Sequence, residues 1–242
     1  NDAFLDRAEE FYQKAADAVP NEDFKKLAMQ YLVATYGPDK LNDPTSRATL
    51  LLDMIELEPD NPENYFALAQ LYEQSGLAEF AEASMTSVLS FLDDDPTVYL
   101  QLAGYYDRAG NFDQMIVQLR ERARIEPDNP EAFYTISTTY WNKAFRDFTI
   151  TQDQKLEYIM SGLEAADDAI ALNDRYVDAL VYKNILLRMQ AGEMVCVDTD
   201  DTECINTQDG LIAEAEELEA LAQQIQDEQR AQAAAAPSAG GE

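Results

Sequence analysis

The strongest constraint on the fold is a six-residue segment, Glu-Pro-Asp-Asn-Pro-Glu, that occurs at residues 58–63 and again at residues 126–131. The two copies lie 68 residues apart, and a partial copy, Asp-Asp-Pro-Thr at residues 94–97, places a proline midway between them. A turn that returns every 34 residues indicates an internal repeat, in which each copy folds as one small structural unit.

The segments that follow the three turns share a helical pattern. In each, an aromatic residue, a leucine or isoleucine, a small residue and a tyrosine stand at positions i, i+3, i+4 and i+7, on one face of an α-helix. These sets are Tyr65, Leu68, Ala69 and Tyr72, then Tyr99, Leu102, Ala103 and Tyr106, and then Phe133, Ile136, Ser137 and Tyr140. A proline begins each helix, where its missing N–H has no helical partner. Gly76 and Gly110 end two of the helices, and a second apolar stretch follows, so each repeat predicts a helix–turn–helix hairpin.

This pattern resembles the tetratricopeptide repeat (TPR), whose 34-residue unit has the same order of residues in its first helix. The resemblance covers residues 26–191 and is most specific over residues 62–140. One departure is Met115, which stands where the second helix of the neighbouring repeat has the small Ala81. Tyr140–Asn173 and Asp178–Ala191 also resemble uncharacterised bacterial secreted or envelope TPR proteins. The resemblance implies an all-α fold, a right-handed superhelical solenoid of helix–turn–helix hairpins with a long C-terminal capping helix.

The remaining segments are placed around this array. We expect N-terminal helices and a degenerate repeat over residues 1–61, followed by the TPR array over residues 62–191. The last full repeat carries an insertion of about 13 residues relative to the 34-residue period. A cysteine-bracketed acidic loop is expected over residues 192–208, a terminal helix over residues 209–232, and a low-complexity tail over residues 233–242.

The charge of the chain excludes some partners. Against 17 Lys and Arg stand 47 Asp and Glu, which gives a formal net charge of −30 and a pI near 4.1. Such a chain repels nucleic-acid phosphates and anionic lipid, so neither is an expected partner. The acidic surface serves solubility, or else adapts the protein to salt, divalent cations or a basic partner. No run of 18 apolar residues is present, so no transmembrane segment is expected.

The cysteines Cys196 and Cys204 bracket the acidic loop and are the two cysteines of the chain. Two cysteines in one polar loop favour a disulfide and an oxidising compartment, that is, an extracytoplasmic, secreted, cell-surface or periplasmic location. The alternative is a pair of free thiols in a cytosolic protein. A zinc site is not expected, because the chain has no histidine and no second cysteine pair.

The same loop offers carboxylates that suit Ca²⁺, namely Asp198, Asp200, Asp201 and Glu203. The EF-hand pattern fails, because Glu203 stands where that loop needs a glycine. Calcium is therefore a candidate cofactor, and a solvated acidic loop without metal is the preferred interpretation. No other cofactor is expected.

The sequence gives no sign of an enzyme. Without histidine, the usual Ser-His and Cys-His nucleophile arrangements are absent. No glycine-rich phosphate loop is present, and no pair of carboxylates stands out for acid–base chemistry. We therefore expect a protein without catalytic activity.

The TPR resemblance implies that the first helices line a groove that binds protein. One known mode clamps a C-terminal carboxylate with Lys and Asn, but the corresponding positions here hold Phe66, Leu100 and Tyr134, and Gln70, Gly104 and Thr138. Such a clamp is therefore absent. The predicted groove consists of Phe66, Gln70, Leu100, Tyr105, Tyr134 and Trp141, with Glu63, Glu73, Asp107 and Glu131 at its rim. It suits an apolar or basic segment, unless its aromatic residues merely pack between repeats.

Two functions remain open for a protein of this kind. The first is a self-assembling structural subunit, a homo-oligomer or a head-to-tail polymer or filament, because solenoid ends associate unless they are capped. The second is a monomeric envelope adaptor or assembly factor that binds an apolar or basic segment of another protein.

Overall fold

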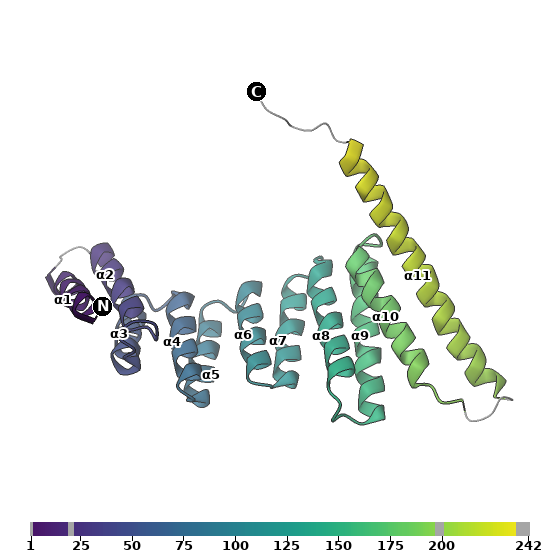
Figure 1. The fold of residues 1–242 in the computed structure, drawn as a ribbon, viewed down its shortest axis with the longest axis horizontal. Coiled ribbons are helices and arrows are strands. Elements are labelled where there is room, and N and C mark those ends of the chain that lie inside the picture. Colours follow the sequence, from purple (N-terminus) through teal and green to yellow (C-terminus); the bar gives the residue numbers. More distant parts are fainter. Residues whose placement is uncertain (1, 19–21, 197–200, 236–242) are drawn as a thin grey trace. The chain divides into compact units, whose positions relative to one another are not determined.

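The computed structural model describes residues 2–18, 22–196 and 201–235; these residues form helices joined by turns and loops, with no strand among them (Figure 1). The helices are α1 (Asp2–Ala18), α2 (Glu22–Thr35), α3 (Pro44–Leu57), α4 (Pro62–Gln74), α5 (Ala78–Ser87), the 3₁₀ helix η1 (Val88–Ser90), α6 (Pro96–Arg108), α7 (Phe112–Ile125), α8 (Pro130–Arg146), α9 (Gln152–Leu172), α10 (Val177–Glu193) and α11 (Thr202–Ala235). The chain forms two compact units, Asn1–Val98 and Tyr99–Glu242. The predicted all-α fold of helix–turn–helix hairpins with a long C-terminal helix is confirmed.

The repeated six-residue segment forms the same turn in both copies. Asn61 and Asn129 have nearly equal backbone angles, φ −94° and ψ 104° against φ −97° and ψ 105°. Each side-chain oxygen accepts a hydrogen bond from the backbone N–H of the glutamate two residues later, at 3.1 Å and 3.0 Å. Each side-chain amide donates to the preceding glutamate, Glu58 or Glu126. Asparagine thus caps the helix that the proline begins, which explains why the segment is repeated.

The turns inside the hairpins depend on glycine. Gly76 and Gly110 have φ values of 73° and 70°, in the left-handed region that other residues adopt only with strain. After each glycine, the next backbone N–H donates to the carbonyl of the tyrosine that recurs in each repeat, Leu77 to Tyr72 and Asn111 to Tyr106. This hydrogen bond is that of a Schellman motif, which ends the first helix of the hairpin and turns the chain back.

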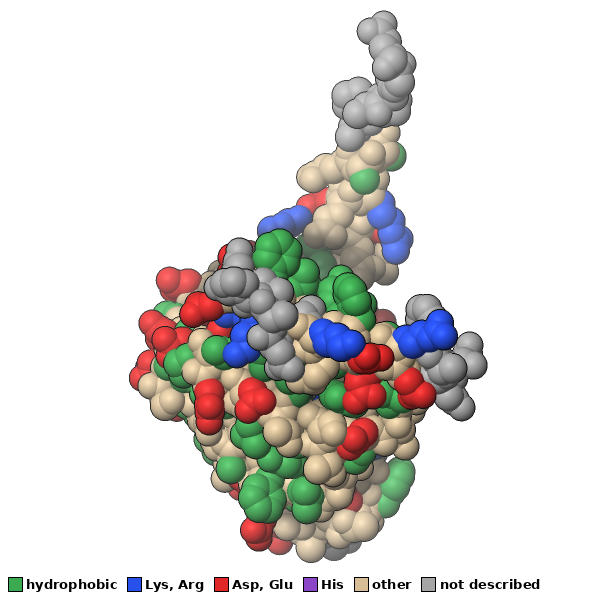
Figure 2. All heavy atoms as spheres, turned by 90° about the vertical axis from the view of Figure 1, so that its left-hand side faces the viewer, with side chains coloured by type: hydrophobic (Ala, Val, Ile, Leu, Met, Phe, Trp, Pro, Cys, Tyr) green, Lys and Arg blue, Asp and Glu red, His purple; other side chains and the backbone are tan. Residues whose placement is uncertain are grey.

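The first unit contains two hairpins and a helix between them. Helices α1 and α2 pack together, α2 packs against α3, and α3 packs against α4, which pairs with α5. Leu51 of α3 forms an apolar cluster with Leu68 and Leu71 of α4. The face of the molecule in Figure 2 has many acidic side chains with hydrophobic side chains standing among them. In this unit Phe11 is 68% exposed and Phe24 is 59% exposed.

In the second unit the hairpin of α8 and α9 is longer than that of α6 and α7. Helices α8 and α9 have 17 and 21 residues, against 13 and 14 for α6 and α7. The α8–α9 hairpin therefore reaches beyond the α6–α7 hairpin (Figure 1). Thr151 and Gln154 form a capping box that starts α9 after the break at residues 147–151. The additional residues of this repeat thus lengthen both helices instead of forming a long loop.

The last helix is longer than the sequence pattern predicts. The predicted bounds of the loop, residues 192–208, and of the terminal helix, residues 209–232, are wrong. In the structure α10 continues to Glu193 and α11 begins at Thr202. The reason lies in Asp201, whose carboxylate accepts a hydrogen bond from the backbone N–H of Cys204 at 3.1 Å and caps the helix. Residues 233–235 of the predicted tail are helical, and residues 236–242 lie outside the described part of the chain.

Helix α11 packs along α10, as a terminal helix should. The buried Asn184 donates its side-chain amide to the carbonyl of Ala215 at 2.8 Å. Ion pairs join Lys183 to Glu214 and Arg188 to Glu219. Among the described residues, no helix is long and apolar enough to cross a membrane.

Candidate protein-binding face

The most prominent surface feature of the second unit is a row of aromatic side chains on α8 and beside α10. We call this row the aromatic face; its members are Tyr134, Trp141, Phe145, Tyr176 and Tyr182. Neighbouring rings lie with centroids 5.2–5.5 Å apart, the distance of direct aromatic packing. Phe145 is 56% exposed and the other members are half-buried, so the row is open to a partner.

The helical spacing explains why these residues meet. Tyr134, Trp141 and Phe145 stand seven and four residues apart, which places them on one side of α8. Helix α10 packs against α8 and α9 and brings Tyr182 against this side. Tyr176 occupies the N-cap position of α10 and contacts Tyr134 edge to face. The aromatic face is therefore formed by α8 and α10, together with the residue that precedes α10.

Trp141 lies at the centre of the aromatic face. Its indole stacks on Phe145 with an angle of 9° between the planes and meets the edge of Tyr182 at 87°. Its Nε1–H is buried and has no hydrogen-bond partner among the described residues. An indole N–H in such a position normally finds an acceptor, because burying it alone is costly.

One end of the aromatic face is acidic. Burial raises the pKa of Tyr134 to about 12, and Tyr182, Asp178, Tyr176 and Glu131 add to the shift through their charges. Burial also raises the pKa of Tyr176, again with Glu131 and Asp178 contributing. Both carboxylates are exposed. Negative charge beside electron-rich rings favours a cationic partner such as Arg or Lys.

The opposite end of α8 carries a projecting segment, which we call the Phe148 tip and which consists of Arg146 and Phe148. Phe148 is 94% exposed. Its turn is held by Asp147, whose carboxylate accepts hydrogen bonds from the backbone N–H and the hydroxyl of Thr149 at 2.9 Å and 2.6 Å. The hydrogen bond from Lys143, with those from Thr149, lowers the pKa of Asp147. The backbone turn that carries Phe148 is therefore held in place.

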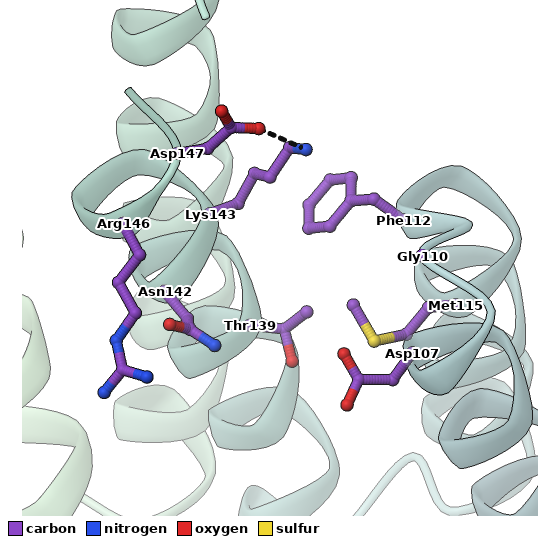
Figure 3. A pocket seen from close by; sticks show the side chains of 9 residues that line it. All are labelled: Asp107, Gly110, Phe112, Met115, Thr139, Asn142, Lys143, Arg146 and Asp147. Atoms are coloured by element: carbon purple, nitrogen blue, oxygen red, sulfur yellow. Dashed lines mark hydrogen bonds and ion pairs between the residues drawn. The ribbon is translucent and has the colours of Figure 1, made fainter. Parts of the chain in front are cut away.

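A pocket of about 390 Å³ lies where α8 extends past the end of α6 (Figure 3). Phe112 and Met115 of α7 provide its apolar wall, while Thr139, Asn142 and Arg146 line it from α8. Lys143 is held at one border by an ion pair with Asp147 at 2.8 Å and lies over the Phe112 ring, as Figure 3 shows. Asp107 lies across the opening from α8 (Figure 3). Its lining carries charges of both signs, which suits no single class of small ligand.

The predicted groove residues fall in different environments. Phe66 and Gln70 belong to the first unit, half-buried and exposed respectively. In the second unit, Leu100 is 38% exposed, whereas Tyr105 is only 4% exposed and packs edge to face on Tyr106. Tyr105 is thus a core residue, as the alternative interpretation of the aromatic residues anticipates.

Tyr134 and Trp141 are the predicted groove residues that the structure brings into one aromatic row, with Tyr182 between them. Tyr176, Tyr182 and the Phe148 tip are not among the predicted site residues. A signal for Tyr182 lies in the apolar spacing of residues 176–190, which is typical of a further first helix of a hairpin. Phe148 has no such signal, because a phenylalanine in a break between helices gives no indication of its exposure.

The predicted calcium ligands are only partly described. Asp198 and Asp200 lie outside the described residues, while Asp201 serves as the cap of α11 and Glu203 is exposed in its first turn. The described residues contain no group of three Cys, Asp or Glu arranged to hold a metal. Calcium binding by this loop stays the alternative to the preferred interpretation, a solvated loop without metal.

The predicted disulfide between Cys196 and Cys204 is confirmed; it joins the segment after α10 to the first turn of α11. We expect the native protein, denatured without reductant, to show no thiol that iodoacetamide can alkylate. After reduction, intact mass should rise by two alkyl groups, one for each cysteine of the chain. Two alkylated thiols without reduction would contradict the bond.

Comparison with known proteins gives likenesses of structure only. No family model matches the chain, and no curated protein matches it. A crystal structure of MamA protein is similar at 13% identity and a TM-score of 0.49, over 92% of this chain and 94% of that one. MamA 41-end from Desulfovibrio magneticus RS-1 is similar at 13% identity and a TM-score of 0.43, over 79% and 93%. A human IFIT1 dimer with PPP-AAAA is similar at 16% identity and a TM-score of 0.40, over 86% of this chain but 46% of that one. By its own hairpins and 34-residue repeat, the chain has the TPR fold.

Proposed function

We propose that this protein is a non-enzymatic scaffold that binds protein through the aromatic face. The observation that carries the proposal is the row of partly exposed, mutually packed rings of the aromatic face. Aromatic side chains dominate the buried centres of protein interfaces, because they bury a large area and lose little conformational entropy.

The charge of the aromatic face defines the chemistry of the partner. Glu131 and Asp178 border Tyr134 and Tyr176, and their charges act on both phenols. A segment that combines aromatic or aliphatic residues with Arg or Lys would pack on the rings and pair with these carboxylates. An acidic segment would be repelled, both by these two residues and by the net charge of −30.

The proposed place of action is extracytoplasmic: a secreted, cell-surface or periplasmic location. The disulfide between Cys196 and Cys204 supports this location, because disulfides persist in oxidising compartments and are rare in the cytosol.

We further propose that the partner is first of all another copy, so that the protein acts as a self-assembling structural subunit, a homo-oligomer or a head-to-tail polymer. The Phe148 tip favours this function, since it presents in the same chain the aromatic and basic chemistry that the aromatic face would bind. The alternative is an adaptor that binds a basic or apolar segment of a different protein.

Trp141 allows a direct test, because it is the only tryptophan of the chain and lies within the aromatic face. We expect a peptide of Phe, Arg and Gly to change the emission of Trp141 saturably, with an affinity that falls as salt is added. The matched peptide with Glu in place of Arg should give no saturable change.

The variant Tyr134→Ala with Asp178→Lys should lose the response to the Arg peptide. The control, Phe80→Ala with Glu79→Lys, removes an exposed aromatic residue and an exposed acid from the first unit and should keep the response. Equal responses to both peptides, or no response to either, would overturn the proposed use of the aromatic face.

A further inference from the structure

The Phe148 tip exposes an aromatic ring that no other part of the described chain covers. Phe148 is 94% exposed, and hydrogen bonds from the Thr149 backbone and hydroxyl to Asp147 hold its backbone turn in place. Leaving a phenyl ring in water is unfavourable compared with burying it. The ring is therefore available for burial by a partner.

Arg146 gives the Phe148 tip its charge. Other cations of the second unit are held in ion pairs, among them Arg122 with Glu126, Arg188 with Glu219, and Lys183 with Asp167 and Glu214. Arg146 has neither an ion pair nor a hydrogen bond among the described residues. An unpaired guanidinium in a chain of net charge −30 is available for an acidic surface.

Within one chain the Phe148 tip cannot reach Glu131 and Asp178, the carboxylates at the acidic end of the aromatic face. Glu131 and Arg146 lie near opposite ends of α8, and a continuous helix separates them by about 22 Å along its axis, at 1.5 Å per residue. Asp178 acts on Tyr134, near the Glu131 end of the same helix. A contact between the Phe148 tip and the acidic end of the aromatic face must therefore join two molecules.

We infer that the Phe148 tip of one copy docks on the acidic end of the aromatic face of a second copy. In this contact Phe148 packs on Tyr134 and Tyr176, and Arg146 pairs with Asp178 and Glu131. The inference rests on the proposed function, for it names the occupant of the same surface. The contact is heterologous, since the tip and the face are different surfaces, and its repetition gives a closed ring or an open chain.

The overall charge sets the conditions of the test. At a net charge of −30 the copies repel one another at low salt, whereas at about 0.15 M salt the Debye length of about 8 Å screens distant charges and leaves contacting pairs effective. We therefore expect the mass of the full chain, measured by sedimentation velocity in about 0.15 M salt, to rise with protein concentration.

A charge reversal on either side should break the contact. Arg146→Glu places an acid against Asp178 and Glu131, and Asp178→Arg places a base against Arg146; both residues are exposed, so folding should be unaffected. We expect each variant alone to associate at least about tenfold more weakly than the native chain. Their mixture should associate again, because the native tip of the Asp178→Arg chain meets the native face of the Arg146→Glu chain, and the two reversed sides attract.

Phe148→Ser tests the apolar part of the contact. Because Phe148 is 94% exposed, the substitution should leave the unfolding transition unchanged while it weakens association. The control Phe24→Ser, at a 59% exposed position of the first unit, should leave both unchanged. The inference is overturned if the native chain stays monomeric, if either reversal or Phe148→Ser associates like the native chain, or if the mixture of reversed variants fails to associate. If the native chain is monomeric and the Arg peptide still binds at Trp141, the proposed function stands without this contact.

Discussion

Replacing Leu102 by alanine is expected to lower the free energy of unfolding by about 2–5 kcal/mol. Leu102 lies in α6 at the repeat position that is also Leu68 and Ile136, and it is 0% exposed. The substitution removes buried methyl and methylene groups and leaves a cavity that the packed helices fill only in part. Urea unfolding, followed by circular dichroism at 222 nm in parallel with the native chain, measures the loss.

Glu121→Ala is the control for Leu102→Ala, since it changes a side chain that is 41% exposed on α7. Its ion pair with Arg124 at 2.7 Å is a surface pair, so the change should stay within about 0.5 kcal/mol. A loss of less than about 1 kcal/mol for Leu102→Ala would show that the repeat positions do not form the core.

Replacing Gly162 by leucine should also destabilise the protein, by about 1–3 kcal/mol or more. Gly162 is buried in α9, where an added Cβ would stand 3.1 Å from a methyl group of Leu186 and 3.3 Å from the Cβ of Tyr140. Larger groups must therefore push α9 away from both α8 and α10. Thermal unfolding should show a lower midpoint than in the native chain.

The same substitution at Gly210 provides a matched control of opposite sign. Gly210 is exposed in α11, and nothing lies within 4 Å of the place where its Cβ would stand. Leucine there should raise the helix stability by up to about 1 kcal/mol, because glycine has a low helix propensity. Equal effects at the two positions would contradict the close packing of α9 between α8 and α10.

The features that the sequence predicts correctly are those with local causes. The cap of Asn61, the proline after it and the glycine of the turn, Gly76, act on residues within one or two helical turns, so the hairpin and its period follow from the printed residues. The disulfide belongs to the same class, because Cys196 and Cys204 are separated by eight positions. The start of α11 also has a local cause, because the carboxylate of Asp201 caps the helix. In a loop rich in acidic residues, the sequence does not show which carboxylate is the cap.

The candidate site depends on contacts between distant residues, which a repeat pattern does not specify. The pattern places both Tyr105 and Tyr134 on the first helix of a hairpin. In the structure Tyr105 is buried, whereas Tyr134 contacts Tyr182, a residue 48 positions later in the chain. Likewise, the periodicity does not distinguish Gly162, where two other helices approach within contact distance, from the open Gly210. Hydrophobic spacing determines which side of a helix is apolar, because the helix geometry is the same in every repeat. Which apolar side chains become core and which remain at the surface is decided when neighbouring helices pack, and in this chain the longer α8–α9 hairpin leaves Phe148 beyond the reach of any of them.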